Sequence, residues 1–199
     1  MIRFEQVTQL HRDMVVRWHR QPIDNNFDGF LALVCEQFSY NFQLWHEEDI
    51  ARSPDVGDER IAQVKRAIDR FNQQRNDAIE RLDDWISAEL EARGIHAAPD
   101  ARLNTETVGS VIDRLSILAL RIFHLEEQRD RLDASPEHRD NVTRKLAVAF
   151  AQHDDLSQAG QELVDDIVAG RKRHKTYRQM KMYNDPAMNP YLYRARKAA

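Results

Sequence analysis

The 199-residue sequence contains one cysteine, Cys35, so the chain cannot form an internal disulfide. It has six glycines and six prolines, and this scarcity of helix-breaking residues favours long helices over many short strands. No stretch approaches the run of about 18 apolar residues that crosses a membrane, and the first residues lack the apolar core of a signal peptide. We therefore predict a soluble protein in a reducing compartment, the cytoplasm.

Positive charge is concentrated at one end of the chain. Residues 170–199 contain nine Lys or Arg against one acid, a net charge of +8. Because the whole chain carries −4, residues 1–169 carry −12. Four of the five tyrosines also lie in these last residues. This asymmetry predicts that the basic tail either folds onto the acidic body or helps to bind an anion.

Apolar residues recur at steps of three and four along almost the whole chain, which predicts helices and no alternating strand. Breaks at Pro, Gly and Asn divide this pattern into five helices, at about residues 4–18, 27–52, 58–92, 105–133 and 137–169. The apolar stripe of the last one includes Phe150 and predicts a buried ring. The predicted fold is all-α: an antiparallel bundle of about five long helices in residues 1–169. The basic, Tyr-rich tail of residues 170–199 packs on it as part of the same domain.

Polar side chains occupy positions where the second and third helices are expected to be buried. Four residues spaced four, three and four apart share one face of the second helix with an apolar stripe; they are Asn41, Trp45, Glu48 and Arg52, with Asp49 beside them. Arg75 holds an inward position of the third helix, next to Asn72. Burial of an unpaired polar group costs about 2–7 kcal/mol. These side chains therefore meet one another, as a salt-bridge network that fixes helix register, or they meet a ligand.

The start of the fourth helix has the features of an anion site. Thr105 or Thr107 can cap it, and Gly109 allows a close approach to its first turn. Free backbone N–H groups and the helix dipole attract negative charge at such an end. A polar line then follows beside the apolar stripe: Ser110, Asp113 or Arg114, Arg121 and His124. The alternative is an ordinary helix cap followed by a solvated face.

The tail combines cations, aromatic rings and apolar anchors. Arg178 and Lys181 are three residues apart and can grip a phosphate, while Tyr177 or Tyr183 can stack on a base or a sugar. The alternative is that the tail is an electrostatic clasp on the acidic bundle.

Four segments, residues 41–52, 65–76, 104–118 and 181–190, together resemble a bacterial family of all-helical proteins known only as a domain of unknown function. The resemblance extends from about residue 30 to residue 193. It implies an all-helical fold and a setting among genes for cell-surface polysaccharide and glycosyl transfer, and it supplies no activity. The chain departs from the family at Val108, where proline is usual at the first turn of a helix.

From these features we predict a cytoplasmic protein that binds a small phosphorylated ligand, a nucleotide sugar or sugar phosphate of surface-glycan metabolism. The reaction is unknown, and whether the protein is an enzyme stays open. The ligand-binding candidates are Asn41, Arg52, Asn72, Arg75, Asn104, Thr107, Ser110, Arg114, Tyr177, Arg178, Lys181, Tyr183 and Asn184. The candidates for a catalytic role are Glu48, Asp49, Asp113 and His124. We predict no cofactor and no metal site.

Two other functions compete with this prediction. One is a non-catalytic adaptor whose tail docks a glycosyltransferase or a second copy of the chain. The other is a nucleotide pyrophosphohydrolase with Mg²⁺ held by clustered acids, drawn from Glu47, Glu48, Asp49, Asp83 and Asp84. A di-iron site is disfavoured because no Glu-x-x-His spacing occurs on two helices. Nucleic-acid binding is disfavoured because the acidic body repels a long polyanion.

Overall fold

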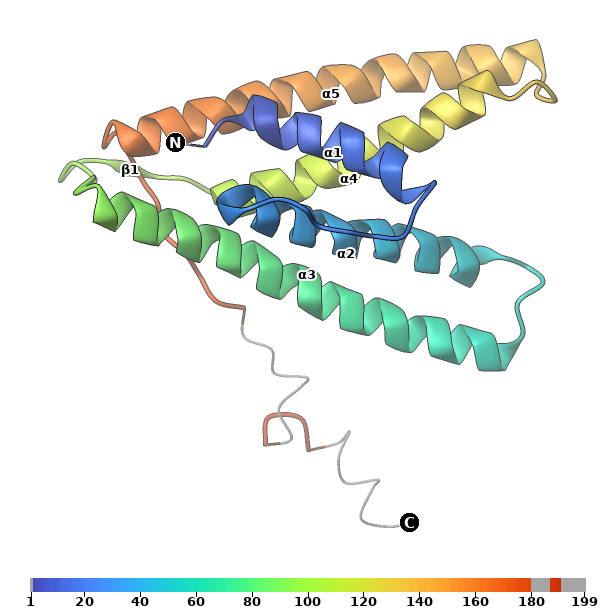
Figure 1. The fold of residues 1–199 in the computed structure, drawn as a ribbon, viewed down its shortest axis with the longest axis horizontal. Coiled ribbons are helices and arrows are strands. Elements are labelled where there is room, and N and C mark those ends of the chain that lie inside the picture. Colours follow the sequence, from blue (N-terminus) through green and yellow to red (C-terminus); the bar gives the residue numbers. More distant parts are fainter. Residues whose placement is uncertain (1, 180–186, 191–199) are drawn as a thin grey trace.

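The computed structural model describes residues 2–179 and 187–190. Within this part of the chain, five helices follow one another: α1 (Phe4–Trp18), α2 (Gly29–Arg52), α3 (Asp58–Ala92), α4 (Val108–Asp130) and α5 (Pro136–Val168). Helices α2 and α3 form one antiparallel hairpin, α4 and α5 form another, and α1 packs against α2, α4 and α5 (Figure 1). The predicted all-α bundle is confirmed, and every helix boundary lies within three residues of its expected position. None of the described helices is long and apolar enough to cross a membrane.

Local signals in the sequence account for the helix ends. Helix α5 begins with Pro136 at its first position, after Ser135, whose Oγ accepts a hydrogen bond from the backbone N–H of His138 at 3.1 Å. Helices α3 and α5 are each followed by a glycine in the left-handed region, Gly94 at φ 64° and Gly170 at φ 74°. A residue with a Cβ is strained in that conformation, so glycine is the favoured residue there.

The expectation that the chain has no strand is wrong in one place. β1 (Arg102–Leu103) pairs in parallel with β2 (Lys172–Arg173), directly after the turn at Gly170. The backbone N–H of Ala98 donates to the carbonyl of Gly170 at 2.9 Å, which fixes the tail beside the loop of residues 95–104. A ladder of two residues is too short to leave an alternating pattern in the sequence.

The main core lies between α1, α2, α4 and the C-terminal halves of α3 and α5. Its fully buried apolar side chains include Phe4, Val7, Val34, Phe38, Leu82, Ile112, Leu115 and Leu120. Phe150 is not part of it: 41% of this residue is exposed, so the prediction of a buried ring is wrong. Helix α5 packs chiefly on α4. The stripe of α5 residues that is buried is therefore narrower than the apolar stripe seen in the sequence.

A buried histidine in α1 carries no hydrogen bond to the described residues. His11 is fully buried, and its ring lies 4.8 Å from the ring of Phe38, measured between centroids. Neither ring nitrogen has a hydrogen-bond partner. Burial, assisted by repulsion from His153, lowers the pKa of His11 from 6.5 to about 3. The folded protein therefore holds this imidazole neutral at a pH where the unfolded chain protonates it.

This difference predicts an acid-dependent loss of stability. Between pH 6.5 and pH 3 the unfolded state binds a proton at His11 that the folded state does not, so stability falls as the pH falls. From pH 7 to pH 5 we expect the wild type to lose about 2 kcal/mol of unfolding free energy relative to His11→Leu. Urea unfolding at both pH values measures the difference. The exposed His138→Leu variant should follow the wild type, and equal losses in wild type and His11→Leu would refute the prediction.

Candidate functional site

A cavity of about 320 Å³ lies where α2, α3 and α4 meet. Seven of its ten lining residues are those that the sequence placed at unexpected core positions: Asn41, Trp45, Glu48, Asp49, Arg52, Asn72 and Arg75. The apolar residues that complete the lining are Leu44, Ile117 and Leu120. The volume is at the lower end of the range for small-molecule sites, which runs from about 300 to 1,000 Å³.

Helical spacing and the hairpin connection bring these residues together. Asn41, Trp45, Glu48 and Arg52 follow one face of α2, from the middle of the helix to its end. Helix α3 returns antiparallel to α2 (Figure 1), and its residues Asn72 and Arg75 line the same cavity as this face. Two separate segments of the chain, on α2 and α3, therefore supply most of the lining of one polar cavity.

Asp113 of α4 does not line the cavity, but it contacts two residues that do, Asn41 and Arg75. Its Oδ1 accepts hydrogen bonds from the side-chain amides of Gln37 at 2.7 Å and Asn41 at 2.8 Å. The same amide of Asn41 also donates to the Oγ of Ser116, which in turn donates to the backbone carbonyl of Asp113 at 2.7 Å. All four of these residues are buried. A closed network of this kind fixes the carboxylate and its neighbours in one geometry.

Arg75 faces this carboxylate without completing a hydrogen bond to it. Its Nε lies 3.6 Å from Oδ1 of Asp113, which is an ion-pair distance and too long for a hydrogen bond. This buried Nε has no hydrogen-bond partner among the described residues. Burial raises the pKa of Asp113, while the charge of Arg75 and the hydrogen bond from Asn41 oppose the rise. Arg75 thus has a buried N–H donor without an acceptor. A hydrogen bond to this donor would contribute more free energy than one formed in water.

The outer part of the cavity is charged and more exposed. Arg52 donates to Glu48 Oε2 at 2.9 Å, one helical turn away, and both side chains are partly open to solvent. Asp49 lies beside them and is exposed. The lining as a whole contains two guanidinium groups and two carboxylates, so it carries no net charge.

The start of α4, predicted as an anion site, is already filled by the protein. Asp83 of α3 is buried, and its Oδ1 accepts from the backbone N–H of Gly109 at 2.9 Å. Thr107 caps the helix, with its Oγ1 accepting from the N–H of Ser110 at 3.2 Å. Burial raises the pKa of Asp83, opposed by the hydrogen bonds from Thr107 and Gly109. The group that approaches Gly109 closely is therefore α3 and not a ligand. The predicted ligand-binding residues Thr107 and Ser110 do not line the cavity.

Two further candidates, Arg114 and Asn104, do not line the cavity. Arg114 pairs with Glu106 at 2.6 Å and lines a separate hollow of about 570 Å³ between α4 and α5. Asn104 is exposed and donates to the backbone carbonyl of Glu106 at 2.9 Å. A hollow of about 720 Å³ between α1 and α5 contains none of the candidates. Among the hollows along the described chain, the smaller cavity at Arg75 therefore gathers the most predicted polar residues.

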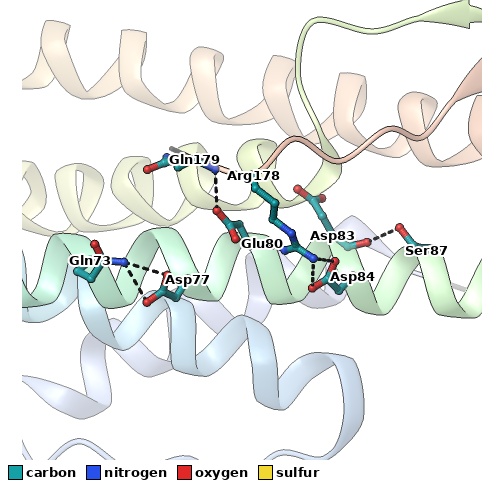
Figure 2. A network of polar contacts seen from close by, with 8 residues as sticks. All are labelled: Gln73, Asp77, Glu80, Asp83, Asp84, Ser87, Arg178 and Gln179. Atoms are coloured by element: carbon teal, nitrogen blue, oxygen red, sulfur yellow. Dashed lines mark hydrogen bonds and ion pairs between the residues drawn. The ribbon is translucent and has the colours of Figure 1, made fainter. Parts of the chain in front are cut away.

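The described start of the tail clasps α3. Nη2 of Arg178 donates to both carboxylate oxygens of Asp84, at 2.6 and 2.8 Å, and Nη1 donates to Glu80 at 3.2 Å (Figure 2). The backbone N–H of Gln179 donates to the same Glu80 at 3.0 Å. Arg178 and the exposed Tyr177 do not line the cavity. The other tail candidates, Lys181, Tyr183 and Asn184, lie outside the described residues.

His124, a catalytic candidate, does not line the cavity but stacks on a residue that does. Its ring is nearly parallel to that of Trp45, with 4.9 Å between centroids. Its Nδ1 lies 2.8 Å from Glu127 Oε2, and its other close neighbours are His19 and His46. Glu48 and Asp49, by contrast, are cavity residues.

The acids required for a magnesium cage are dispersed. Glu48 and Asp49 line the cavity, Asp83 caps α4, and Asp84 pairs with Arg178. In residues 2–179 and 187–190, the only three-residue set of His, Cys, Asp or Glu close enough to hold a metal ion is a histidine set. Cys35 is buried, and burial raises the pKa of its thiol to about 12, so it is no ready nucleophile.

Sequence reasoning missed several polar residues of these networks. Gln37 and Ser116 anchor the cavity network, and Asp83 fills the start of α4. Gln37 precedes Asn41 by four residues, and Ser116 follows Asp113 by three. Each pair therefore shares a helix face, and this spacing in the sequence indicates that Gln37 and Ser116 belong to the same network. The role of Asp83 depends on a contact between two helices, for which the sequence holds no local signal.

Fold and site together define an all-α bundle with a small polar cavity between its hairpins. The chain belongs to the family described as Protein of unknown function (DUF4254), whose model matches residues 31–176. That span includes every residue that lines the cavity. No curated protein and no solved structure matches the chain.

Proposed function

We propose that this protein binds the sugar-phosphate part of a sugar phosphate or nucleotide sugar in the cavity between α2, α3 and α4. The observation that carries the proposal is that Arg75 lines the cavity while its buried Nε lacks a hydrogen-bond partner among the described residues. A guanidinium group is the side chain best suited to bind a phosphate through charge-assisted hydrogen bonds. Arg75 is therefore the principal phosphate ligand in this proposal, with Arg52 at the open side.

The rest of the lining favours a hydroxylated ligand over a bare anion. Glu48 and Asp49 accept hydrogen bonds from hydroxyl groups, and the amide of Asn72 can donate and accept. Trp45 offers an aromatic surface to the apolar face of a sugar ring. Because the lining has no net charge, a ligand with several negative charges would meet as much repulsion as attraction. The cavity is accordingly assigned to a sugar bearing one phosphate, with any nucleoside part outside it.

The chemical setting supports the same class of ligand. The family resemblance implies neighbouring genes for cell-surface polysaccharide and glycosyl transfer. Phosphorylated sugars are the substrates of that chemistry. Asp113, predicted as a catalytic candidate, does not line the cavity, and within the proposal it is the counter-ion that positions Arg75. The proposal assigns no catalytic role, and binding is tested first.

Removal of the guanidinium should weaken binding without loss of the fold. For Arg75→Gln we expect an affinity lower by about 10- to 100-fold, because one charge-assisted hydrogen bond is worth about 1.5–3 kcal/mol. Calorimetric titration with a hexose phosphate, UDP- and GDP-hexoses, free hexose and inorganic phosphate measures the effect. Arg66→Gln is the matched control, since Arg66 is an exposed residue of the same helix that does not line the cavity.

The same panel separates the competing functions. The proposal fails if no phosphorylated sugar binds to the wild type, or if the Arg66 and Arg75 variants bind equally well. If no compound of the panel binds and a second protein co-purifies with this one in a stable complex, the protein is an adaptor. Release of phosphate from nucleotides that a chelator abolishes would identify a pyrophosphohydrolase.

A further inference from the structure

Three histidines from three helical segments meet near the end of α2. They are His19, which follows α1, His46 of α2 and His124 of α4. One ring nitrogen of each lies within 4.8 Å of a ring nitrogen of the other two. All three side chains are half-buried. Since the three residues are far apart in the sequence, only the packing of α1 onto the two hairpins brings them together.

The hydrogen bonds of the three rings leave the same atom free on each. Nδ1 of His19 lies 2.6 Å from the carbonyl of Val15, and Nδ1 of His46 lies 2.8 Å from the carbonyl of Phe42. A carbonyl oxygen only accepts, so both Nδ1 atoms carry a hydrogen. Nδ1 of His124 faces the carboxylate of Glu127 at 2.8 Å and donates to it in the same way.

The Nε2 atoms are therefore the lone-pair atoms of this cluster. Those of His19 and His124 are buried and have no hydrogen-bond partner among the described residues. Aromatic contacts hold the rings in position: His19 stacks on Phe123 at 4.1 Å, His46 lies 4.4 Å from Phe42, and His124 stacks on Trp45. Two unpaired buried nitrogens in a fixed, mostly aromatic shell are unfavourable unless another group uses them.

From this arrangement we infer a metal site in which the Nε2 atoms of His19, His46 and His124 bind a divalent transition ion, with Zn²⁺ the best fit. Three neutral imidazoles are a typical ligand set for zinc with a fourth position open to water or a ligand. In a tetrahedral site with Zn–N bonds of about 2.0–2.1 Å, the ligand nitrogens lie about 3.3–3.4 Å apart. Small rotations of the rings that move each nitrogen by roughly an ångström would bring them to this separation.

The partners of the Nδ1 atoms fit the same site. A metal-bound histidine usually donates its second N–H to a carbonyl or a carboxylate, which fixes the tautomer and makes the ring a better ligand. Val15, Phe42 and Glu127 provide such acceptors. The sequence predicted no metal site, and this inference departs from that prediction. It is independent of the proposed sugar-phosphate function, although Trp45 both lines the cavity and stacks on His124.

Metal titration of the full-length, untagged protein tests the site after treatment with chelator. We expect one equivalent of Zn²⁺ to bind with micromolar or tighter affinity and to raise the melting temperature, and Co²⁺ to give the visible spectrum of a tetrahedral nitrogen site. His46→Gln and His124→Gln should each weaken Zn²⁺ binding at least 100-fold. Glu127→Gln should weaken it about tenfold, because the ligand geometry is kept and only its support is lost.

His138→Gln, at an exposed position outside the cluster, is the matched control and should bind Zn²⁺ like the wild type. Circular dichroism of each metal-free variant checks that it is folded, and the two single-histidine variants provide independent tests. Absence of Zn²⁺ binding at micromolar concentrations would overturn the inference. So would binding that persists unchanged in both variants, because the three rings would then form only an aromatic cluster.

Discussion

Asp113→Ala should lower the free energy of unfolding by about 3–5 kcal/mol, the range for removal of one partner from a buried ion pair. The substitution takes the acceptor from the side-chain amides of Gln37 and Asn41 and the counter-charge from Arg75. The Gln37 amide loses its acceptor, which accounts for about 1–3 kcal/mol of this range, whereas the Asn41 amide keeps its hydrogen bond to Ser116. Urea unfolding followed by circular dichroism at neutral pH measures the change.

Two further variants show whether the buried network is the cause. Asp113→Asn keeps an oxygen that accepts from both amides, and burial already opposes the carboxylate charge, so we expect a smaller loss of about 1 kcal/mol. Asp69→Ala removes an exposed carboxylate that pairs with Lys65 on the surface of α3, and it should cost less than about 1 kcal/mol. If Asp113→Ala costs no more than Asp69→Ala, the network does not stabilise the fold.

Gly109→Ala should destabilise the protein by about 3 kcal/mol through a single added methyl group. A Cβ at this position would lie 2.8 Å from the backbone carbonyl oxygen of Ile79 and 2.9 Å from the Oδ1 of Asp83. The carbonyl belongs to the rigid helix α3, so α4 must shift away. This shift strains the packing, at about 1–3 kcal/mol, and weakens the hydrogen bond from the Gly109 N–H to Asp83. Thermal and urea unfolding report the loss.

Gly57→Ala is the matched control for this prediction. Gly57 precedes the first turn of α3, and a Cβ there would meet no atom within 4 Å. We expect it to cost no more than about 1 kcal/mol, the typical effect at a helix cap. Equal stability of the two variants would mean that α3 and α4 are not held as closely as the structure has them.

Most of the fold could be predicted because helix formation is encoded by short-range spacing. The periodicity of apolar residues identified all five helices; Gly94 marked the end of α3, and Pro136 and Gly170 marked the two ends of α5. The same short-range logic found the cavity residues, since a polar residue at core spacing is visible within a single helix. Asn41, Trp45 and Arg75 were selected in this way, and they line one cavity.

Which groups pair with one another could not be predicted in the same way. The first turn of α4 looked open to an outside anion, but Asp83 from a neighbouring helix occupies it. Arg178 looked free to grip a phosphate, but Glu80 and Asp84 bind it. The contacts of Arg178 are those of the alternative prediction, an electrostatic clasp on the acidic bundle. In both cases the sequence identified the chemistry of the group but not the particular residue that it meets, because that residue lies on another segment.

The sequence by itself therefore determined the class of fold, the acidic body with its basic tail, and the polar stripes on α2 and α3, since each of these is a property of neighbouring residues. The tertiary structure alone decided that Asp83 fills the start of α4 and that His19, His46 and His124 face one another. The physical reason is that hydrogen bonds and contacts between rings act over a few ångströms in space. The three histidines are about 27 and 78 positions apart in the sequence, so they come within that reach only when the helices have packed.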